Sequence, residues 1–101
     1  MPEPRLPIPR DELEALCRRW KVRRLSLFGS VLRDDFGPDS DIDVLVEFDP
    51  EARIGFFGLA RMQRELEELF GGRSVDLLTP GFLSPYIKDR VMQSASLQYA
   101  A

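Results

Sequence analysis

The stretch from Leu27 to Phe48, LFGSVLRDDFGPDSDIDVLVEF, decides the fold because it joins two strand-like segments through a short connection. The segments Val22–Phe28 and Ile42–Phe48 are rich in Val, Ile, Leu and Phe, which predicts two strands. Gly29-Ser30 interrupts the first strand, and a short helix is expected over residues 30–35. The glycine and proline of Phe36–Asp39 then predict a turn.

Outside this stretch, the spacing of apolar residues predicts further elements. These are helices that open near Asp11, Gly55 and Ser84 and end near Trp20, Phe70 and Tyr99, and a strand over residues 74–79. The last helix is expected to direct Tyr86, Ile87, Val91 and Leu97 inward. Strands alternating with helices predict an α/β or α+β domain with a small mixed sheet of about three strands, whose order the sequence leaves open. We expect this single domain over residues 10–101, after an extended proline-containing arm over 1–9.

The composition excludes several classes of chemistry. The 101 residues contain no histidine, which removes Ser-His-Asp and Cys-His catalysis. The one cysteine, Cys17, lies at core spacing in the first helix and is expected to be a buried apolar residue. The chain contains no apolar run of about 20 residues and no secretory signal, so we expect no membrane association and a cytoplasmic location.

Charge is unevenly distributed along the chain. Residues 34–50 contain seven Asp or Glu and no Lys or Arg, although they overlap the apolar run Ile42-Asp43-Val44-Leu45-Val46. Such a block repels phosphates unless cations intervene, so we expect no direct nucleic-acid binding by this region.

Asp41 and Asp43 lie two residues apart at the start of the second predicted strand. Alternate side chains of a strand share a face, so both carboxylates are expected on one side while Ile42 and Val44 enter the core. Two like charges at this spacing weaken the fold and raise each other's pKa unless a cation lies between them. Mg²⁺ suits such a pair, because it binds one or two carboxylates together with waters and substrate phosphates.

Two further groups complete the candidate site. Gly29 permits close approach of a ligand, and the Ser30 hydroxyl and Arg33 guanidinium can bind phosphate oxygens at the start of the short helix. Asp76 lies between apolar residues on the third predicted strand. If that strand pairs with the second one, three carboxylates converge, and Asp76 can complete a metal site or accept a proton.

The spacing Gly29-Ser30, ten residues, then Asp41-x-Asp43 resembles the signature of the polymerase-beta-like nucleotidyltransferase superfamily. Arg33 and Ser40-Asp41-Ile42-Asp43 look like its minimal branch, the minimal nucleotidyltransferase (MNT) family. The segment FFGLARMQRELEELFG resembles that branch's middle helix, and Asp76 falls where its third acid lies.

The resemblance implies a nucleotidyltransferase that uses ATP. It also implies an antitoxin similar to the MNT proteins paired with HEPN-domain ribonuclease toxins, in which the antitoxin can adenylylate a tyrosine of the toxin. It also implies roles for the residues. Gly29, Ser30 and Arg33 would bind the nucleotide, and Asp41, Asp43 and Asp76 would be catalytic and bind two Mg²⁺ ions.

Two alternatives stay open from the sequence. An antitoxin of this kind could neutralise its toxin by binding alone, without catalysis. A nucleotidyltransferase of this kind could instead modify a small molecule or an RNA end. The predicted elements account for all 101 residues, so we expect the acceptor to bind in a shallow groove or to be presented by a partner protein.

Overall fold

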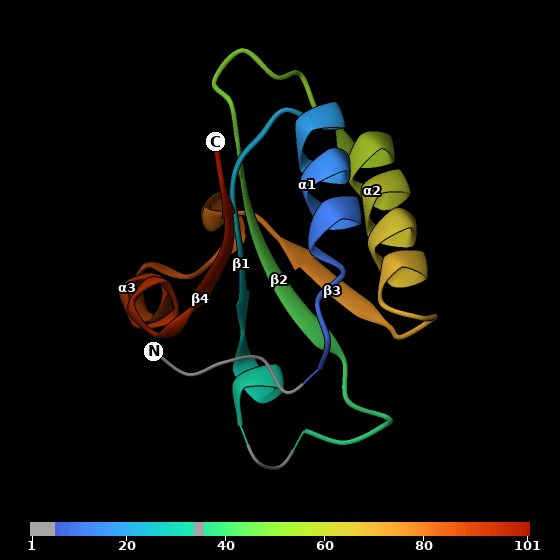
Figure 1. Ribbon diagram of the computed structural model, residues 1–101. Helices are drawn as coiled ribbons and strands as arrows, with labels where there is room; N and C mark the ends of the chain where they lie inside the picture. Colours follow the sequence, from blue (N-terminus) through green and yellow to red (C-terminus); the bar gives the residue numbers. More distant parts are fainter. Residues whose placement is uncertain (1–5, 34–35) are drawn as a thin grey trace.

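Two antiparallel strands joined through Gly29 form the middle of the sheet. The computed structural model describes residues 6–33 and 36–101 (Figure 1). Its elements, in chain order, are α1 (Arg10–Arg19), β1 (Val22–Phe28), the 3₁₀ helix η1 (Gly29–Leu32), β2 (Ile42–Phe48), α2 (Phe56–Leu69), β3 (Val75–Leu78), the 3₁₀ helix η2 (Pro80–Phe82), α3 (Pro85–Ser94) and β4 (Ser96–Ala100). The two strands of the deciding stretch therefore have the predicted bounds.

The sheet is mixed, with the strand order β3-β2-β1-β4. β1 pairs antiparallel with β2 on one side and with β4 on the other, and β2 pairs parallel with β3. The connection from β2 to β3 runs through α2, as a parallel crossover requires. Because β2 and β3 run in the same direction, both begin at the end of the sheet where β1 finishes.

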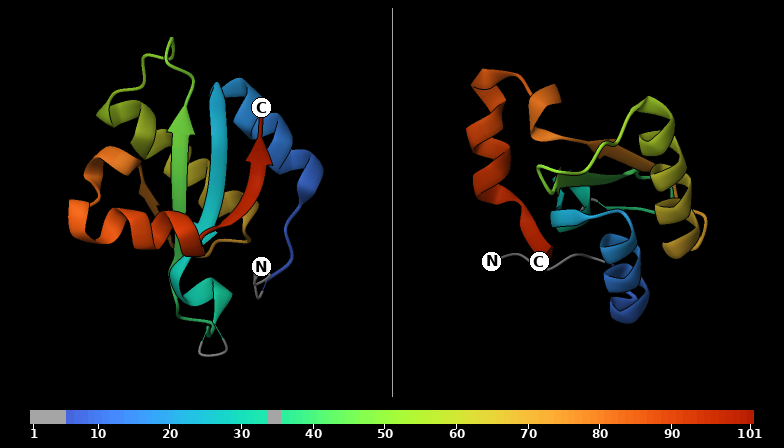
Figure 2. Two further views of the ribbon diagram at one scale, coloured as in Figure 1. Left: turned by 90° about the vertical axis from the view of Figure 1, so that its left-hand side faces the viewer. Right: turned by 90° about the horizontal axis from the view of Figure 1, so that it is seen from above.

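The two faces of the sheet differ in character. Ile42, Val44 and Val46 of β2 are fully buried and belong to the hydrophobic core that α1 and α2 cover. The intervening Asp43 and Glu47 therefore project from the opposite face. Figure 2 shows that α1 and α2 lie on one side of the sheet and α3 on the other. The main core thus occupies one face, and the second carries Asp43 and Glu47 together with the buried Leu45.

The two helices over the core are joined by polar contacts at their edges. Arg19 of α1 forms an ion pair with Glu65 of α2, and the Trp20 indole Nε1 donates a hydrogen bond to the same carboxylate at 3.0 Å. α2 ends at the predicted glycines: Gly71 has φ +76° and its N–H donates to the Glu68 carbonyl. A left-handed residue of this kind is the usual helix terminator.

The predicted last helix is wrong in its second half. α3 ends at Ser94, and residues 96–100 form β4 on the free edge of β1, so the described sheet has four strands rather than about three. Tyr86, Ile87 and Leu97, expected inward, are exposed, and only Val91 is partly buried. Pairing with β1 satisfies backbone groups that a helix would leave on the sheet edge, and local spacing gives no sign of this partner.

The predicted short helix over 30–35 is a single 3₁₀ turn, Gly29–Leu32, and Arg33 follows it in extended conformation. Residues 34 and 35 lie outside the described residues, as do residues 1–5 of the expected arm. The described end of that arm, Leu6 and Ile8, packs against the core.

Cys17 is fully buried in the core, as predicted. Burial raises the pKa of its thiol to about 12, so the thiolate is strongly disfavoured. Among the described helices, none has both the length and the apolar character to cross a membrane.

The core predicts a clear contrast between two leucines. Leu66 of α2 is fully buried, whereas Leu97 of β4 is 48% exposed. Leu66→Ala should lower the free energy of unfolding by about 2–5 kcal/mol, because it removes buried methyl groups and leaves a cavity. Leu97→Ala should lower it by less than about 1 kcal/mol. Urea denaturation of both variants measures the difference, and equal losses would contradict the described core.

Candidate active site

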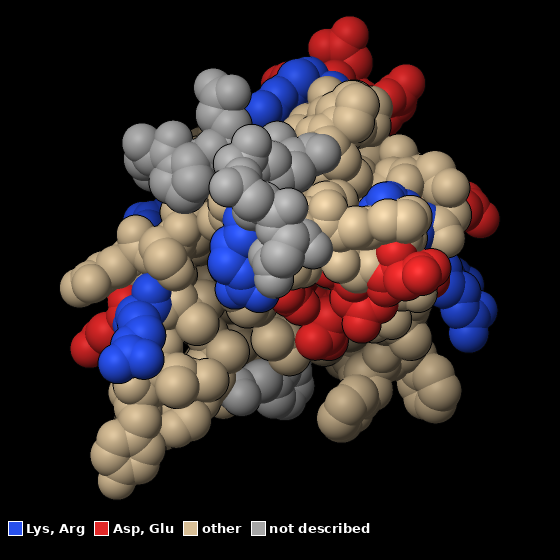
Figure 3. Space-filling model, turned by 90° about the horizontal axis from the view of Figure 1, so that it is seen from below, with Lys and Arg blue, Asp and Glu red and all other residues tan. Residues whose placement is uncertain are grey.

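The parallel pairing of β2 with β3 brings two of the predicted acids together. Asp43 and Asp76 are register partners on these strands. Neighbouring strands lie about 4.8 Å apart, and paired residues project from the same face. Both acids therefore stand side by side on the face opposite the core. Figure 3 views this end of the molecule and shows Asp and Glu side chains gathered beside Lys or Arg side chains.

The electrostatic environment of Asp43 reflects this convergence. Burial raises the pKa of the half-buried Asp43 carboxyl, and the nearby Asp76 and Asp41 carboxylates raise it further. Arg33 acts in the opposite sense and lowers it. The fold thus brings three predicted acids and the predicted arginine within electrostatic reach of one another.

Gly29 lies directly against the Asp43 carboxylate. Its φ is +74°, and a Cβ placed on it would lie 2.2 Å from Asp43 Oδ2. Phe28, the residue before it, is the register partner of Asp43 on the antiparallel β1–β2 pair. Only glycine therefore allows the chain to turn here while the carboxylate occupies this space. This contact joins the predicted nucleotide-binding residues to the predicted metal-binding residues.

Asp41 and Ser30 meet at the edge of the site. Asp41 is exposed and precedes β2, which begins at Ile42, so it lies just outside the strand on which it was expected. The Ser30 hydroxyl donates to the Asp41 carbonyl at 3.4 Å. This hydrogen bond connects η1 to the start of β2. Because η1 is a single turn, the expected contribution of a helix dipole to phosphate binding is small.

The acids fit a magnesium site that substrate completes. Within residues 6–33 and 36–101, no group of three or more His, Cys, Asp or Glu forms a metal-binding cluster by itself. Mg²⁺ does not require one, since it retains waters and binds one or two carboxylates with substrate phosphates. The Asp43 carboxyl has a raised pKa because of burial and of the nearby Asp76 and Asp41 carboxylates, and Arg33 offsets part of that shift. Carboxylates held this close together are suitable ligands for a divalent cation.

Arg73 supports the site, although no sequence pattern singles it out. Its guanidinium Nη2 donates to the carbonyls of Gly37 and Ser40, the latter at 3.1 Å. The guanidinium carbon lies 4.3 Å from the centroid of the Phe36 ring. Arg73 thus fastens the loop before Asp41 to the start of β3. Its position after two glycines is typical of a surface loop, so no local pattern distinguishes it.

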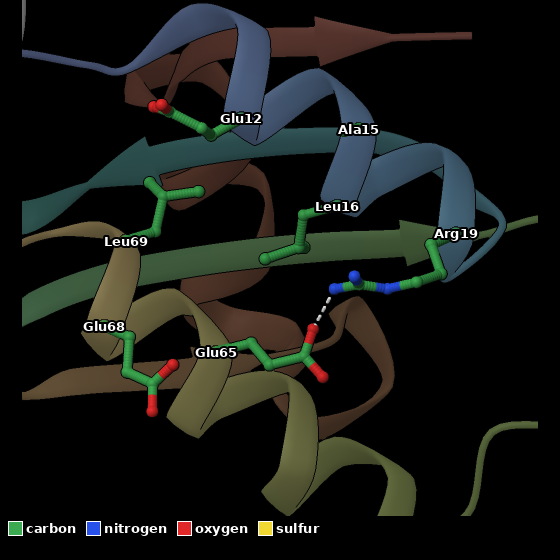
Figure 4. Close-up of a pocket in the computed structure, with 7 residues that line it drawn as sticks. All are labelled: Glu12, Ala15, Leu16, Arg19, Glu65, Glu68 and Leu69. Atoms are coloured by element: carbon green, nitrogen blue, oxygen red, sulfur yellow. Dashed lines mark hydrogen bonds and ion pairs between the residues drawn. The ribbon is translucent and has the colours of Figure 1, made fainter.

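A groove of about 730 Å³ lies between α1 and α2, away from these acids. Glu12, Arg19, Glu65 and Glu68 project around it, with the apolar Leu16 and Leu69 between them (Figure 4). The groove is formed by the helices over the core face. None of the predicted site residues is among those that line it.

The chain belongs to the nucleotidyltransferase domain family, whose model matches residues 10–97. A Methanocaldococcus jannaschii protein named as a candidate protein adenylyltransferase is 42% identical over 73% of this chain and 76% of that protein. The protein adenylyltransferase MntA of Thermococcus cleftensis is 35% identical over 77% of this chain and 76% of MntA. The predicted activity class, a nucleotidyltransferase of the minimal branch, is therefore confirmed.

Solved structures agree with this assignment. A candidate minimal nucleotidyltransferase superposes with a TM-score of 0.69 at 34% identity, over 84% of this chain and 83% of that one. A toxin–antitoxin with AMP-PNP superposes with a TM-score of 0.73 at 19% identity, over 92% of this chain and 74% of that one. The MntA–HepT toxin–antitoxin gives a TM-score of 0.64 at 18% identity, over 91% and 70%. The last two support the fold alone.

The contact of Gly29 with Asp43 predicts that substitution of Gly29 lowers activity in addition to its effect on stability. Gly29 and Gly71 have nearly the same positive φ, but only Gly29 has an atom within 4 Å of an added Cβ. Gly29→Ala and Gly71→Ala should each lower stability by about 1–2 kcal/mol through backbone strain. Only Gly29→Ala should also abolish nucleotide transfer, because the Asp43 carboxylate has to turn away. Urea denaturation and a transfer assay measure the two effects. Full activity of Gly29→Ala would contradict this role of the glycine.

The raised pKa of Asp43 predicts a pH-dependent stability in metal-free buffer. The folded state holds the Asp43 proton more tightly than the unfolded state, whose carboxyl has the ordinary value of 3.8. Stability from this group is therefore lost as the pH rises from about 3.8 through the raised pKa. Asp43→Asn avoids that loss, so its melting temperature should exceed that of the wild type at neutral pH.

Low pH provides an internal reference for the comparison of Asp43→Asn with the wild type. Below the ordinary value of 3.8 Asp43 is protonated in both states, and the advantage of Asp43→Asn should disappear. Asp89→Asn, at an exposed position of α3, serves as the control and should change the melting temperature little. A melting temperature of Asp43→Asn below that of the wild type at neutral pH would contradict the electrostatic account.

Proposed function

We propose that this protein is a magnesium-dependent protein adenylyltransferase antitoxin that transfers AMP from ATP to a tyrosine of a HEPN-type ribonuclease toxin. The observation that carries the proposal is the pairing of Asp43 with Asp76 beside Gly29, whose backbone lies against the Asp43 carboxylate. This arrangement places the backbone of Gly29, which a phosphate can approach closely, beside a group of acids that can bind metal ions. Nucleotidyl transfer requires both features.

The residues then have distinct roles. Asp41 and Asp43 bind magnesium, which when bound neutralises charge on the triphosphate and on the leaving pyrophosphate. Gly29, Ser30 and Arg33 bind phosphate oxygens. Asp76 accepts the proton of the acceptor hydroxyl. The acceptor oxygen forms a bond to the α-phosphorus, the bond from that phosphorus to the bridging oxygen of pyrophosphate breaks, and pyrophosphate leaves with the electron pair.

A protein acceptor is supported by the surface and by the relatives. Phe56 and Phe57 at the start of α2 and Tyr86 at the start of α3 are more than 80% exposed. Large exposed apolar residues of this kind are typical of protein-binding surfaces. Relatives carry the name protein adenylyltransferase, and folds like this one occur in toxin–antitoxin complexes, one of them with AMP-PNP.

Labelling with ATP tests the proposal. The purified protein is incubated with Mg²⁺, α-labelled ATP and the product of the neighbouring gene, and the label is located by mass spectrometry. We expect AMP on a tyrosine of the partner and no label from γ-labelled ATP, because the terminal phosphates leave as pyrophosphate. Chelation of the metal should abolish labelling. The absence of label on any protein would refute protein adenylylation.

A double variant separates catalysis from binding. Asp41→Asn with Asp43→Asn should lower transfer by at least about a thousandfold, since both magnesium-binding carboxylates lose their charge. Lys88→Gln on exposed α3 is the control and should retain transfer. If the double variant still neutralises the toxin fully in cells, the antitoxin acts by binding alone. If label instead appears on an RNA end or a small molecule, the acceptor class in the proposal is wrong.

A further inference from the structure

A second cavity lies beside Gly29, at the end of β1. It has a volume of about 370 Å³ and lies between η1 and α3. Its lining includes Gly29, the same residue whose backbone contacts Asp43. The cavity therefore opens next to the point where the proposed site receives phosphates.

Two arginines from separate elements line this cavity. Arg33 follows η1, and Arg90 belongs to α3. The remaining walls are largely apolar: Phe28, Leu32 and Val91. A guanidinium presents a planar fork of donors to phosphate oxygens, and apolar surroundings strengthen its attraction for an anion.

The part of α3 that reaches the cavity is one side of the helix. Arg90, Val91 and Ser94 line it, and residues four apart in a helix lie on the same side. Lys88 and Asp89 do not line it. All ten residues of α3 are described, and none is buried. Apolar packing of the helix is limited to the partly buried Val91 and Met92.

A second cationic side chain beside Arg33 would favour the binding of a triphosphate at this site. A triphosphate has to approach Asp41, Asp43 and Asp76, whose negative charge repels it. Arg33 follows η1 and lines the cavity together with Gly29. Arg90 adds a positive charge from another element at the same cavity. The phosphate chain is also the part of a nucleotide that must lie beside the metal-binding acids.

We propose that the β- and γ-phosphates of the nucleotide enter this cavity and that Arg90 binds their oxygens together with Arg33. The inference rests on the proposed function for the orientation of the nucleotide. It assigns to Arg90 of α3 a role in binding the phosphates of the nucleotide. After transfer, pyrophosphate occupies the same position until it leaves.

Binding measurements on Arg90→Gln test the assignment without an acceptor. Isothermal titration at fixed ionic strength compares ATP with Mg²⁺, inorganic pyrophosphate with Mg²⁺, and AMP. Arg90→Gln should weaken ATP and pyrophosphate binding by about tenfold, through loss of charge-assisted hydrogen bonds. AMP affinity should stay unchanged, because AMP lacks the β- and γ-phosphates. Lys88→Gln, a cation of the same helix outside the cavity, should bind all three ligands like the wild type.

Each contrary result has a defined meaning. Unchanged pyrophosphate affinity in Arg90→Gln, or no pyrophosphate binding by the wild type, would overturn the inference. An equal loss of AMP and ATP affinity would also overturn it, because the nucleoside would then occupy the cavity. Arg90-dependent pyrophosphate binding without transfer to any protein would leave the inference standing and refute the proposed function. Thermal unfolding of Arg90→Gln verifies that the variant is folded.

Discussion

The alternation along β2 is the constraint on which the rest of the structure depends. Ile42, Val44 and Val46 are fully buried beneath α1 and α2, so Asp43 has to emerge on the opposite face. Shifting the strand by one residue would bury the carboxylate and expose the core. The hydrophobic effect that stabilises the sheet thereby also fixes the direction of the acid. Its neighbours, Asp76 through parallel pairing and Gly29 through the β1 connection, follow from the same register.

The acids oppose folding while they support the proposed chemistry. Burial and two neighbouring carboxylates raise the pKa of Asp43, which means that its charged form is disfavoured in the folded protein. In the proposed function, a metal ion bound with the triphosphate would relieve that cost. The hydrophobic core on the other face supplies stability that offsets this electrostatic cost. One face of the sheet therefore stabilises the fold, and the other carries the acids of the candidate site.

The parts of the molecule that depend on local pattern were predictable from the sequence. β1 and β2 have the predicted bounds because their apolar residues recur at strand spacing, and α2 ends at its glycines. β4 was missed because its place is set by the free edge of β1, some seventy residues earlier in the chain. Arg73 was missed for a similar reason. It donates hydrogen bonds to a loop formed by a distant segment, and it lies in no pattern that distinguishes it from a surface arginine.

The strand order has a mechanical consequence for α3. The helix follows β3, at one edge of the sheet, and leads into β4, at the other edge. It therefore spans the open face as a bridge anchored at both ends. The anchors are backbone hydrogen bonds of the sheet, while no side chain of the helix is fully buried. Movement of the helix away from this face would therefore require the C-terminal strand to separate from β1.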